Sequence, residues 1–202
     1  MIEEYFANDM KDAIRHGMCV SHLAARLATE AGYDEGTVHM VAVAGIIHDI
    51  GKLKITPYIY GRQQDTMRIE EMRYMRLHSK LGAEVAEREG YDKEIQDIIL
   101  YHHENYDGTG YPFGLRGEEI PLGARIIRIC DVFVALISDR AYRGAFEPET
   151  AITMVIDEVR HFDMKLFLAF QRLINTSDII KELSDILHKD IPGLQDVELI
   201  EV

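Results

Sequence analysis

The stretch that decides the fold is VHMVAVAGIIHDIGK, residues 38–52, in which an apolar run leads directly into His48 and Asp49. Asp34 is a good N-cap for a helix that continues to His48. A histidine and an aspartate at the end of a buried helix are costly unless a cation neutralises them. Alternatively, the helix ends at the surface and His48 and Asp49 are exposed to water. We therefore expect the end of this helix to carry part of a metal site.

The chain on both sides of this stretch reads as further helices. Gly32 ends a first helical pattern, and residues 104–120 are rich in glycine and form a loop. Residues 51–66 look irregular, and only VELIEV at the end of the chain suggests a strand. The pattern predicts an all-α bundle with one long loop. The expected helices span 9–31, 34–48, 66–89 (one or two helices), 92–103, 121–138 and three segments that begin at Pro148, Asp163 and Ser177.

Composition sets the class of protein. The chain has 202 residues, enough for one domain, which we place at 1–175, with 176–202 as a C-terminal helix and tail packed on it. Its net charge of −13 argues against non-specific binding to DNA, RNA or an anionic membrane. The two cysteines, Cys19 and Cys130, read as small buried residues in a reducing compartment. The start lacks a signal-peptide pattern and no apolar run could span a bilayer, so a cytoplasmic location is expected.

Several histidines fall where a helix should be apolar. His16 shares a helix face with Val20 and Leu23, so it should point inward, whereas His22 should point to water. Asp12 lies one turn before His16 on the same inward face. A core histidine bonded to a backbone carbonyl is the simpler explanation of His16 alone.

Three more histidines follow apolar segments. His78 shares its face mostly with apolar residues, and His102 and His103 follow Ile98-Ile99-Leu100. Neighbours on a helix diverge by about 100°, so His102 and His103 reach one site only if the helix ends there. The glycine-rich loop after them permits this.

Asp131 is the residue whose sequence context most clearly indicates a buried polar site. It lies within LGARIIRICDVFVALIS, residues 122–138, a segment apolar nearly all round. A carboxylate inside such a helix needs a metal ion or an arginine. Arg125 and Arg128 are the arginine candidates.

Together these residues suggest a two-metal centre. Imidazole with carboxylate suits iron, manganese or zinc better than calcium or magnesium. Five histidines and two aspartates are too many ligands for one ion, and they suit two ions that share a carboxylate. Two ions about 3.5–4 Å apart are a recurrent device for hydrolysing phosphate esters, and they would attract an anionic substrate to an acidic protein.

The motifs themselves resemble a known family. HDIGK at 48–52, HHENYDGTGYP at 102–112, GEEIPLGARIIRICDVFVAL at 117–136 and DRAYR at 139–143 are similar to the HD-GYP domain family of the HD superfamily of metal-dependent phosphohydrolases. The similarity covers roughly residues 10–172. It implies an HD-domain helical bundle with a GYP-containing loop, and hydrolysis of the bacterial second messenger cyclic di-GMP.

The resemblance also assigns roles. It implies attack by a hydroxide that bridges two metal ions, with iron or manganese expected, and Asp49 as the bridging ligand. Lys52 would contact a phosphate or position the attacking water. Asp12 would hold a third ion or accept a hydrogen bond from the His16 ring. The implied metal ligands are His16, His48, Asp49, His78, His102, His103 and Asp131, and the implied substrate-binding residues are Lys52, Gly110, Tyr111, Pro112, Arg140 and Arg143.

A second interpretation is a weakly active or inactive module that senses the nucleotide or docks a signalling protein through the GYP loop. Val134 favours it, because the family usually has a second aspartate there. Asn105 and Tyr106 also replace the usual Arg and Trp. A third interpretation is an HD phosphohydrolase acting on another nucleotide. A homodimer is compatible with each of these.

Overall fold

The computed structural model describes residues 2–55, 74–139 and 143–189, with side chains from residue 10 onward. Within these ranges the chain is helical and contains no β-strand, so the all-α prediction is confirmed. The expected VELIEV strand and the part of the predicted 66–89 helix before residue 74 lie outside them. The α-helices are α1 (Ile2–Glu30), α2 (Glu35–Ile47), α5 (His78–Arg88), α6 (Lys93–Tyr101), α7 (Leu122–Ile137), α8 (Pro148–Asp157), α9 (Met164–Thr176) and α10 (Ile179–His188), with short 3₁₀ turns at Gly117–Glu119 and Val159–His161.

The helix ends follow the local sequence. Gly32 has a φ of +82° directly after α1, a conformation that glycine adopts without a steric penalty. Asp34 caps α2 by accepting a hydrogen bond from the Thr37 N–H at 2.8 Å. Asp163 caps α9 in the same way through the Lys165 N–H at 2.9 Å. These boundaries confirm the predicted starts of α2 and α9.

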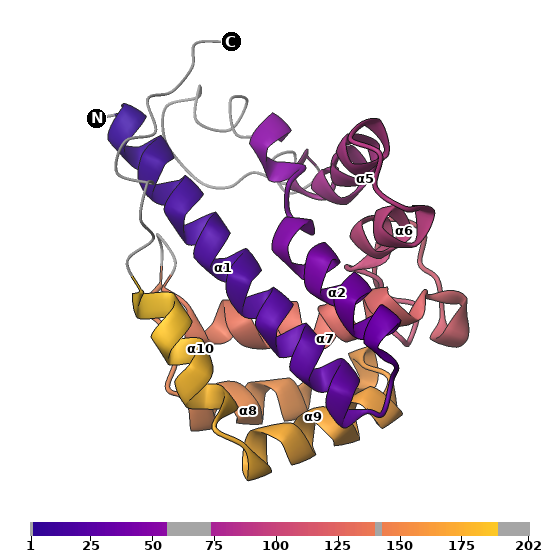
Figure 1. The fold of residues 1–202 in the computed structure, drawn as a ribbon, viewed down its shortest axis with the longest axis vertical. Coiled ribbons are helices and arrows are strands. Elements are labelled where there is room, and N and C mark those ends of the chain that lie inside the picture. Colours follow the sequence, from indigo (N-terminus) through magenta and orange to yellow (C-terminus); the bar gives the residue numbers. More distant parts are fainter. Residues whose placement is uncertain (1, 56–73, 140–142, 190–202) are drawn as a thin grey trace.

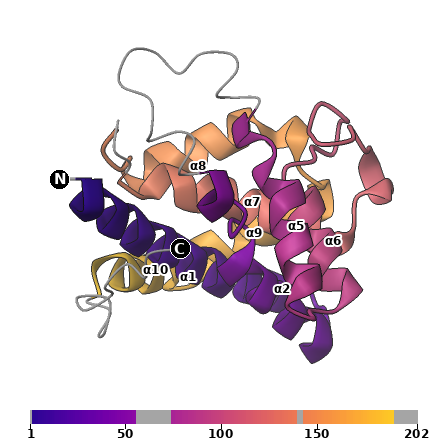
Figure 2. The ribbon, with the colours of Figure 1, turned by 90° about the horizontal axis from the view of Figure 1, so that it is seen from above.

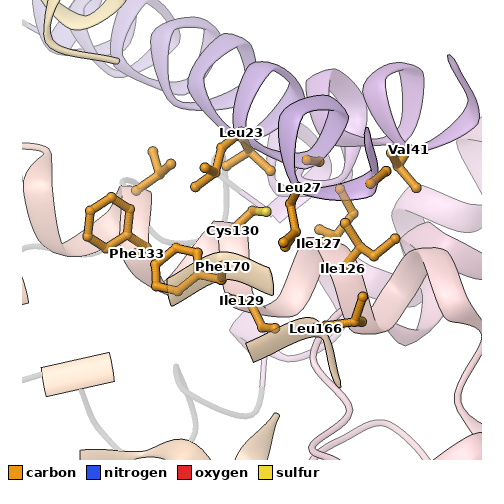
Figure 3. Packing of buried hydrophobic residues seen from close by; sticks show 14 of the residues in the cluster. Leu23, Leu27, Val41, Ile126, Ile127, Ile129, Cys130, Phe133, Leu166 and Phe170 are labelled. Atoms are coloured by element: carbon orange, nitrogen blue, oxygen red, sulfur yellow. The ribbon is translucent and has the colours of Figure 1, made fainter. Parts of the chain in front are cut away.

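The core lies where α1, α2, α7 and α9 meet. Figure 1 shows α1 and α2 side by side, with α7 crossing behind them. Leu23 and Leu27 of α1 pack there against α7 and against Phe170 of α9 (Figure 3). Cys130 is fully buried in this cluster and Cys19 in its α1 wall, and both are free thiols, as predicted. α7 is therefore the central helix of this core.

Two glycines allow the elements around His48 to approach closely. A Cβ on Gly45 would lie 2.7 Å from Ser21 Cα, so α1 and α2 touch through their backbones. A Cβ on Gly51 would collide with the His78 carbonyl oxygen at the start of α5. The glycine of HDIGK thus brings the turn after α2 against α5, and Figure 2 shows α5 and α6 packed beside this turn.

Some expectations change. α1 begins at Ile2 rather than at Asp9. His22 does not point freely into water, because α10 covers it and its Nε2 lies 2.7 Å from Glu182. The helix-face argument missed this because α10 packs on the more polar side of α1. None of the helices in the described ranges is long and apolar enough to cross a membrane.

Candidate metal centre

Five separate elements bring the predicted residues together. His16 comes from the middle of α1, His48 and Asp49 from the end of α2, and His78 is the first residue of α5. His102 and His103 follow α6, which ends at Tyr101, so the two neighbours can face one site as predicted. Asp131 reaches the same place from α7.

The imidazole tautomers are set by the backbone. His48, His78 and His102 each donate an Nδ1–H to the carbonyl three residues earlier, at 2.9, 2.6 and 2.7 Å. Each neutral ring then presents an unprotonated Nε2 to the interior. The His78 Nε2 nevertheless lies 3.2 Å from the His102 Nε2 and 3.0 Å from that of His103. The facing lone pairs of His78 and His102 repel at this distance unless a cation lies between them.

The ligand atoms fall into two groups that share one carboxylate. One group consists of Asp49, His78, His102 and His103, and the other contains His16, His48 and Asp49. Oδ1 of Asp49 lies 3.3 Å from the His78 Nε2, and its Oδ2 lies 3.4 Å from the His48 Nε2. Each carboxylate oxygen of Asp49 therefore faces a different group.

Asp131 closes the second group. Its Oδ1 lies 3.0 Å from the His16 Nε2 and 3.6 Å from the His48 Nε2. Neither candidate arginine pairs with it, because Arg125 binds Asp163 at 2.6 Å and Arg128 donates to Asn105 at 2.9 Å. Burial alone would raise the pKa of Asp131, but its contacts with His16 and His48 outweigh this and hold the pKa well below its usual range. The carboxylate is therefore ionised.

Burial keeps most of the imidazoles neutral. It lowers the pKa of His102, with neighbouring histidines acting in the same direction, and it lowers the pKa of His103 to about 3. His48 behaves oppositely, because Asp49 and Asp131 together outweigh burial and raise its pKa. Neutral imidazoles and ionised carboxylates are the protonation states that metal binding requires.

The donor set fits divalent transition-metal ions. The His48 Nε2 and the Asp49 Oδ1 are buried and have no hydrogen-bond partner among the described residues. Two ligands at a right angle on one ion, each about 2.1 Å from it, are about 3.0 Å apart, close to the Nε2 separations in the His78 group. Nitrogen-rich sites with carboxylates suit iron, manganese or zinc.

The loop after His103 is held against the site by a residue that the sequence reasoning missed. Glu104 is buried, and its carboxylate accepts hydrogen bonds from the N–H groups of Phe113, Gly114 and Leu115 at 2.7, 3.1 and 3.1 Å. The available signal was an acidic residue directly between two histidines and a glycine-rich loop that needs anchoring.

The GYP residues lie on this anchored loop. A Cβ on Gly110 would lie 2.5 Å from both Glu104 Cα and the His103 oxygen, so only glycine fits. The Tyr111 ring stacks on His103 with centroids 4.6 Å apart, and the Arg76 guanidinium lies 5.1 Å from the centre of the Tyr111 ring. A cis peptide bond precedes Pro112. Gly110 and Tyr111 thus border the His103 side of the centre.

Three predicted residues are placed less directly. Arg143 donates hydrogen bonds to the carbonyls of Ala135 and Leu136 and lies 4.2 Å from the centre of the Phe146 ring, so its guanidinium caps the end of α7. Arg140 lies outside the described residues. The Asp12 side chain is 65% exposed and lies 3.8 Å from Arg15, in contrast to the predicted inward face.

The comparisons with known proteins agree with this geometry. The profile of the HD domain family matches residues 1–166. The chain belongs to the HD domain family. The HD domain family is metal-dependent, which agrees with the two groups of histidine and aspartate ligands found here.

Two curated members of similar sequence are bacterial enzymes. A cyclic di-GMP phosphodiesterase of Pseudomonas aeruginosa is 34% identical over 160 residues, 79% of this chain and 38% of that protein. The cyclic di-GMP phosphodiesterase response regulator RpfG of Xanthomonas campestris is 38% identical over 136 residues, 66% of this chain and 35% of that protein. The chain thus spans little more than a third of the length of either HD-domain relative.

Solved HD structures share the fold. An HDG"Y"P protein of Bdellovibrio bacteriovorus superposes with a TM-score of 0.64 at 22% identity, covering 81% of this chain and 52% of that one. At this identity the match supports the helical HD arrangement and nothing finer.

Proposed function

We propose that this HD domain hydrolyses a cyclic dinucleotide phosphodiester, with cyclic di-GMP as the substrate. The observation that carries the proposal is the pair of histidine–aspartate groups that share Asp49. The names of the two curated relatives support the choice of cyclic di-GMP.

Two divalent ions, iron or manganese by the donor chemistry, fit the two groups. His16, His48, Asp131 and one oxygen of Asp49 would hold one ion, and His78, His102, His103 and the other oxygen of Asp49 would hold the second. Such ions lower the pKa of bound water and stabilise charge on phosphate oxygens. A third ion near Asp12 remains a prediction.

The chain's own residues would orient the substrate. The Lys52 ammonium lies 2.5 Å from Asp49 Oδ2 while its side chain is 39% exposed, so it spans from the bridging carboxylate toward solvent. There it can bind a phosphate oxygen and hold Asp49 in place. Tyr111, stacked on His103, forms an apolar wall beside the reacting phosphate. Phosphate contacts by Arg140 and Arg143 remain predictions.

Turnover by metal-loaded protein tests the proposal. Protein loaded with Fe²⁺ or Mn²⁺ is incubated with cyclic di-GMP, and the products are separated by chromatography, with cyclic GMP–AMP and cyclic di-AMP as comparison substrates. We expect loss of cyclic di-GMP and about two metal ions per chain by elemental analysis. Asp49→Asn should lose both turnover and metal. His22→Gln is the matched control, because His22 lies on α1 but binds Glu182 rather than the metal centre.

Two outcomes would reject parts of the proposal. Binding of cyclic di-GMP without hydrolysis by fully loaded protein would favour the nucleotide-sensor or partner-docking module. Val134 would then be the residue to restore to aspartate, although its side chain is fully buried in the core. Faster hydrolysis of cyclic GMP–AMP or cyclic di-AMP would keep the reaction and change the substrate.

A further inference from the structure

Arg128 is an unusual cation on the central helix. It precedes Asp131 by three residues on α7, so the two side chains share a helix face. Its Nε donates to the Asn105 Oδ1 at 2.9 Å, and Asn105 lies two residues after His103. In the part of the chain that the structure describes, no carboxylate oxygen lies within 4.0 Å of its guanidinium.

Lys52 is paired with Asp49, and Arg125 with Asp163. Arg143 donates to carbonyls at the end of α7, and Arg76 lies over the Tyr111 ring. Arg128 differs from Lys52 and Arg125 because its partner among the described residues is a neutral amide, so no carboxylate there neutralises its charge. With the Nε–H used, its two amino groups retain four N–H donors for another acceptor.

The charge of Arg128 reaches the His103 side of the site. The bond of Arg128 to Asn105 holds the guanidinium beside the start of the loop that follows His103. Asp131 lies one turn further along the same face of α7. Arg128 therefore lies near both His103 and Asp131, two of the residues that would hold the ions.

We infer that Arg128 binds a non-bridging phosphate oxygen of the substrate on the His103 side of the site, and that Asn105 positions its guanidinium. This rests on the proposed phosphodiesterase function. Arg128 is partly buried and carries no carboxylate partner among the described residues, so its planar guanidinium remains available to an anion that binds beside it. The planar fork suits two oxygens of one phosphate, and Asn105 restricts its rotation.

Affinity measured without turnover is the first test. Calorimetry with metal-free protein gives the affinity for cyclic di-GMP and for inorganic phosphate. Arg128→Gln should weaken both about tenfold to a hundredfold, the usual effect of losing a charge-assisted hydrogen bond. Arg128→Lys keeps the charge and should lose less, and it carries the test if the glutamine variant does not fold. Arg88→Gln makes the same charge change on the exposed surface of α5 and should have no effect.

Kinetics separates phosphate from base recognition. With metal-loaded protein, Arg128→Gln should reduce kcat/KM by similar factors for cyclic di-GMP and for bis(p-nitrophenyl) phosphate, a diester without guanine. A loss confined to cyclic di-GMP would overturn the phosphate assignment in favour of a guanine contact. Unchanged affinity and unchanged kcat/KM in Arg128→Gln would overturn the inference entirely.

The role of Asn105 has its own readout. Asn105→Ala should weaken phosphate binding less than Arg128→Gln, and it should have no further effect when Arg128 is already glutamine. Equal effects of Asn105→Ala in both backgrounds would show that Asn105 acts independently of Arg128. If wild-type protein fails to hydrolyse cyclic di-GMP, the proposed function fails, while phosphate affinity and the activated diester still decide the role of Arg128.

Discussion

Replacement of Glu104 by glutamine should loosen the loop that borders the metal centre. Oε1 of Glu104 accepts the N–H groups of Phe113 and Gly114, and Oε2 accepts that of Leu115. The amide oxygen of glutamine can keep two of these bonds in weaker, uncharged form. Its NH₂ group must then face the Leu115 N–H, which leaves a donor opposite a donor.

The expected cost follows from these contacts. A buried polar group without a partner costs about 1–3 kcal/mol, and a hydrogen bond to a charged acceptor exceeds a neutral one by about 1 kcal/mol. Glu104→Gln should therefore lower the free energy of unfolding by about 2–4 kcal/mol. It should also weaken metal binding by the His78 group, because the same loop presses Tyr111 onto His103.

Urea denaturation of metal-free protein and a metal titration followed by elemental analysis measure the two effects. Glu119→Gln is the matched control, since Glu119 accepts one backbone N–H, that of Arg116, on the exposed side of the loop. It should cost less than about 1 kcal/mol. A Glu104→Gln variant within about 0.5 kcal/mol of wild type, with unchanged metal content, would refute the view that this carboxylate holds the loop.

Other expectations concern single residues. Asp131→Asn should release the ion held with His16 and His48 while the His78 group stays loaded, as elemental analysis would show by about one ion remaining per chain. Arg143→Gln should lower the free energy of unfolding by about 2 kcal/mol through lost caps at the end of α7; unchanged stability with weaker cyclic di-GMP binding would instead support the predicted phosphate contact. The pKa of His103 is lowered from 6.5 to about 3 in the folded protein, so the unfolded chain takes up the proton first. Stability of metal-free protein should therefore fall on acidification below pH about 6.5, by up to about 1.4 kcal/mol per pH unit for this residue, and His103→Gln should flatten that slope in pH-dependent denaturation.

The helices were predictable because their signals are local. Asp34, Gly32 and Asp163 act within one turn of the backbone they cap, so sequence spacing suffices to place them. The position of α10 could not be predicted in this way. It depends on Ile179 and Leu183, near the end of the chain, packing into the common core. That packing turns His22, expected in water, into a partner of Glu182.

The metal centre was predictable for a related reason. A charged or imidazole side chain on an apolar helix face is costly, so His16, His48 and Asp131 stand out without knowledge of the fold. The hydrogen-bond partners of Arg143 could not be predicted from the helix pattern. Its acceptors, the carbonyls of Ala135 and Leu136, are backbone groups exposed only because α7 stops at Ile137 and the chain turns back.

The same close approaches that build the site also determine its energetics. Gly51 and Gly110 bring backbone against His78 and His103, and in the same place the unprotonated Nε2 atoms of His78 and His102 lie 3.2 Å apart. Folding alone gains nothing from that arrangement, because buried lone pairs and two ionised carboxylates repel and are poorly solvated. A bound cation reverses the sign of each of these interactions, so free energy of metal binding becomes free energy of folding. The turns after α2 and α6 should therefore be least stable without metal, although their apolar neighbours in α1 and α7 remain packed.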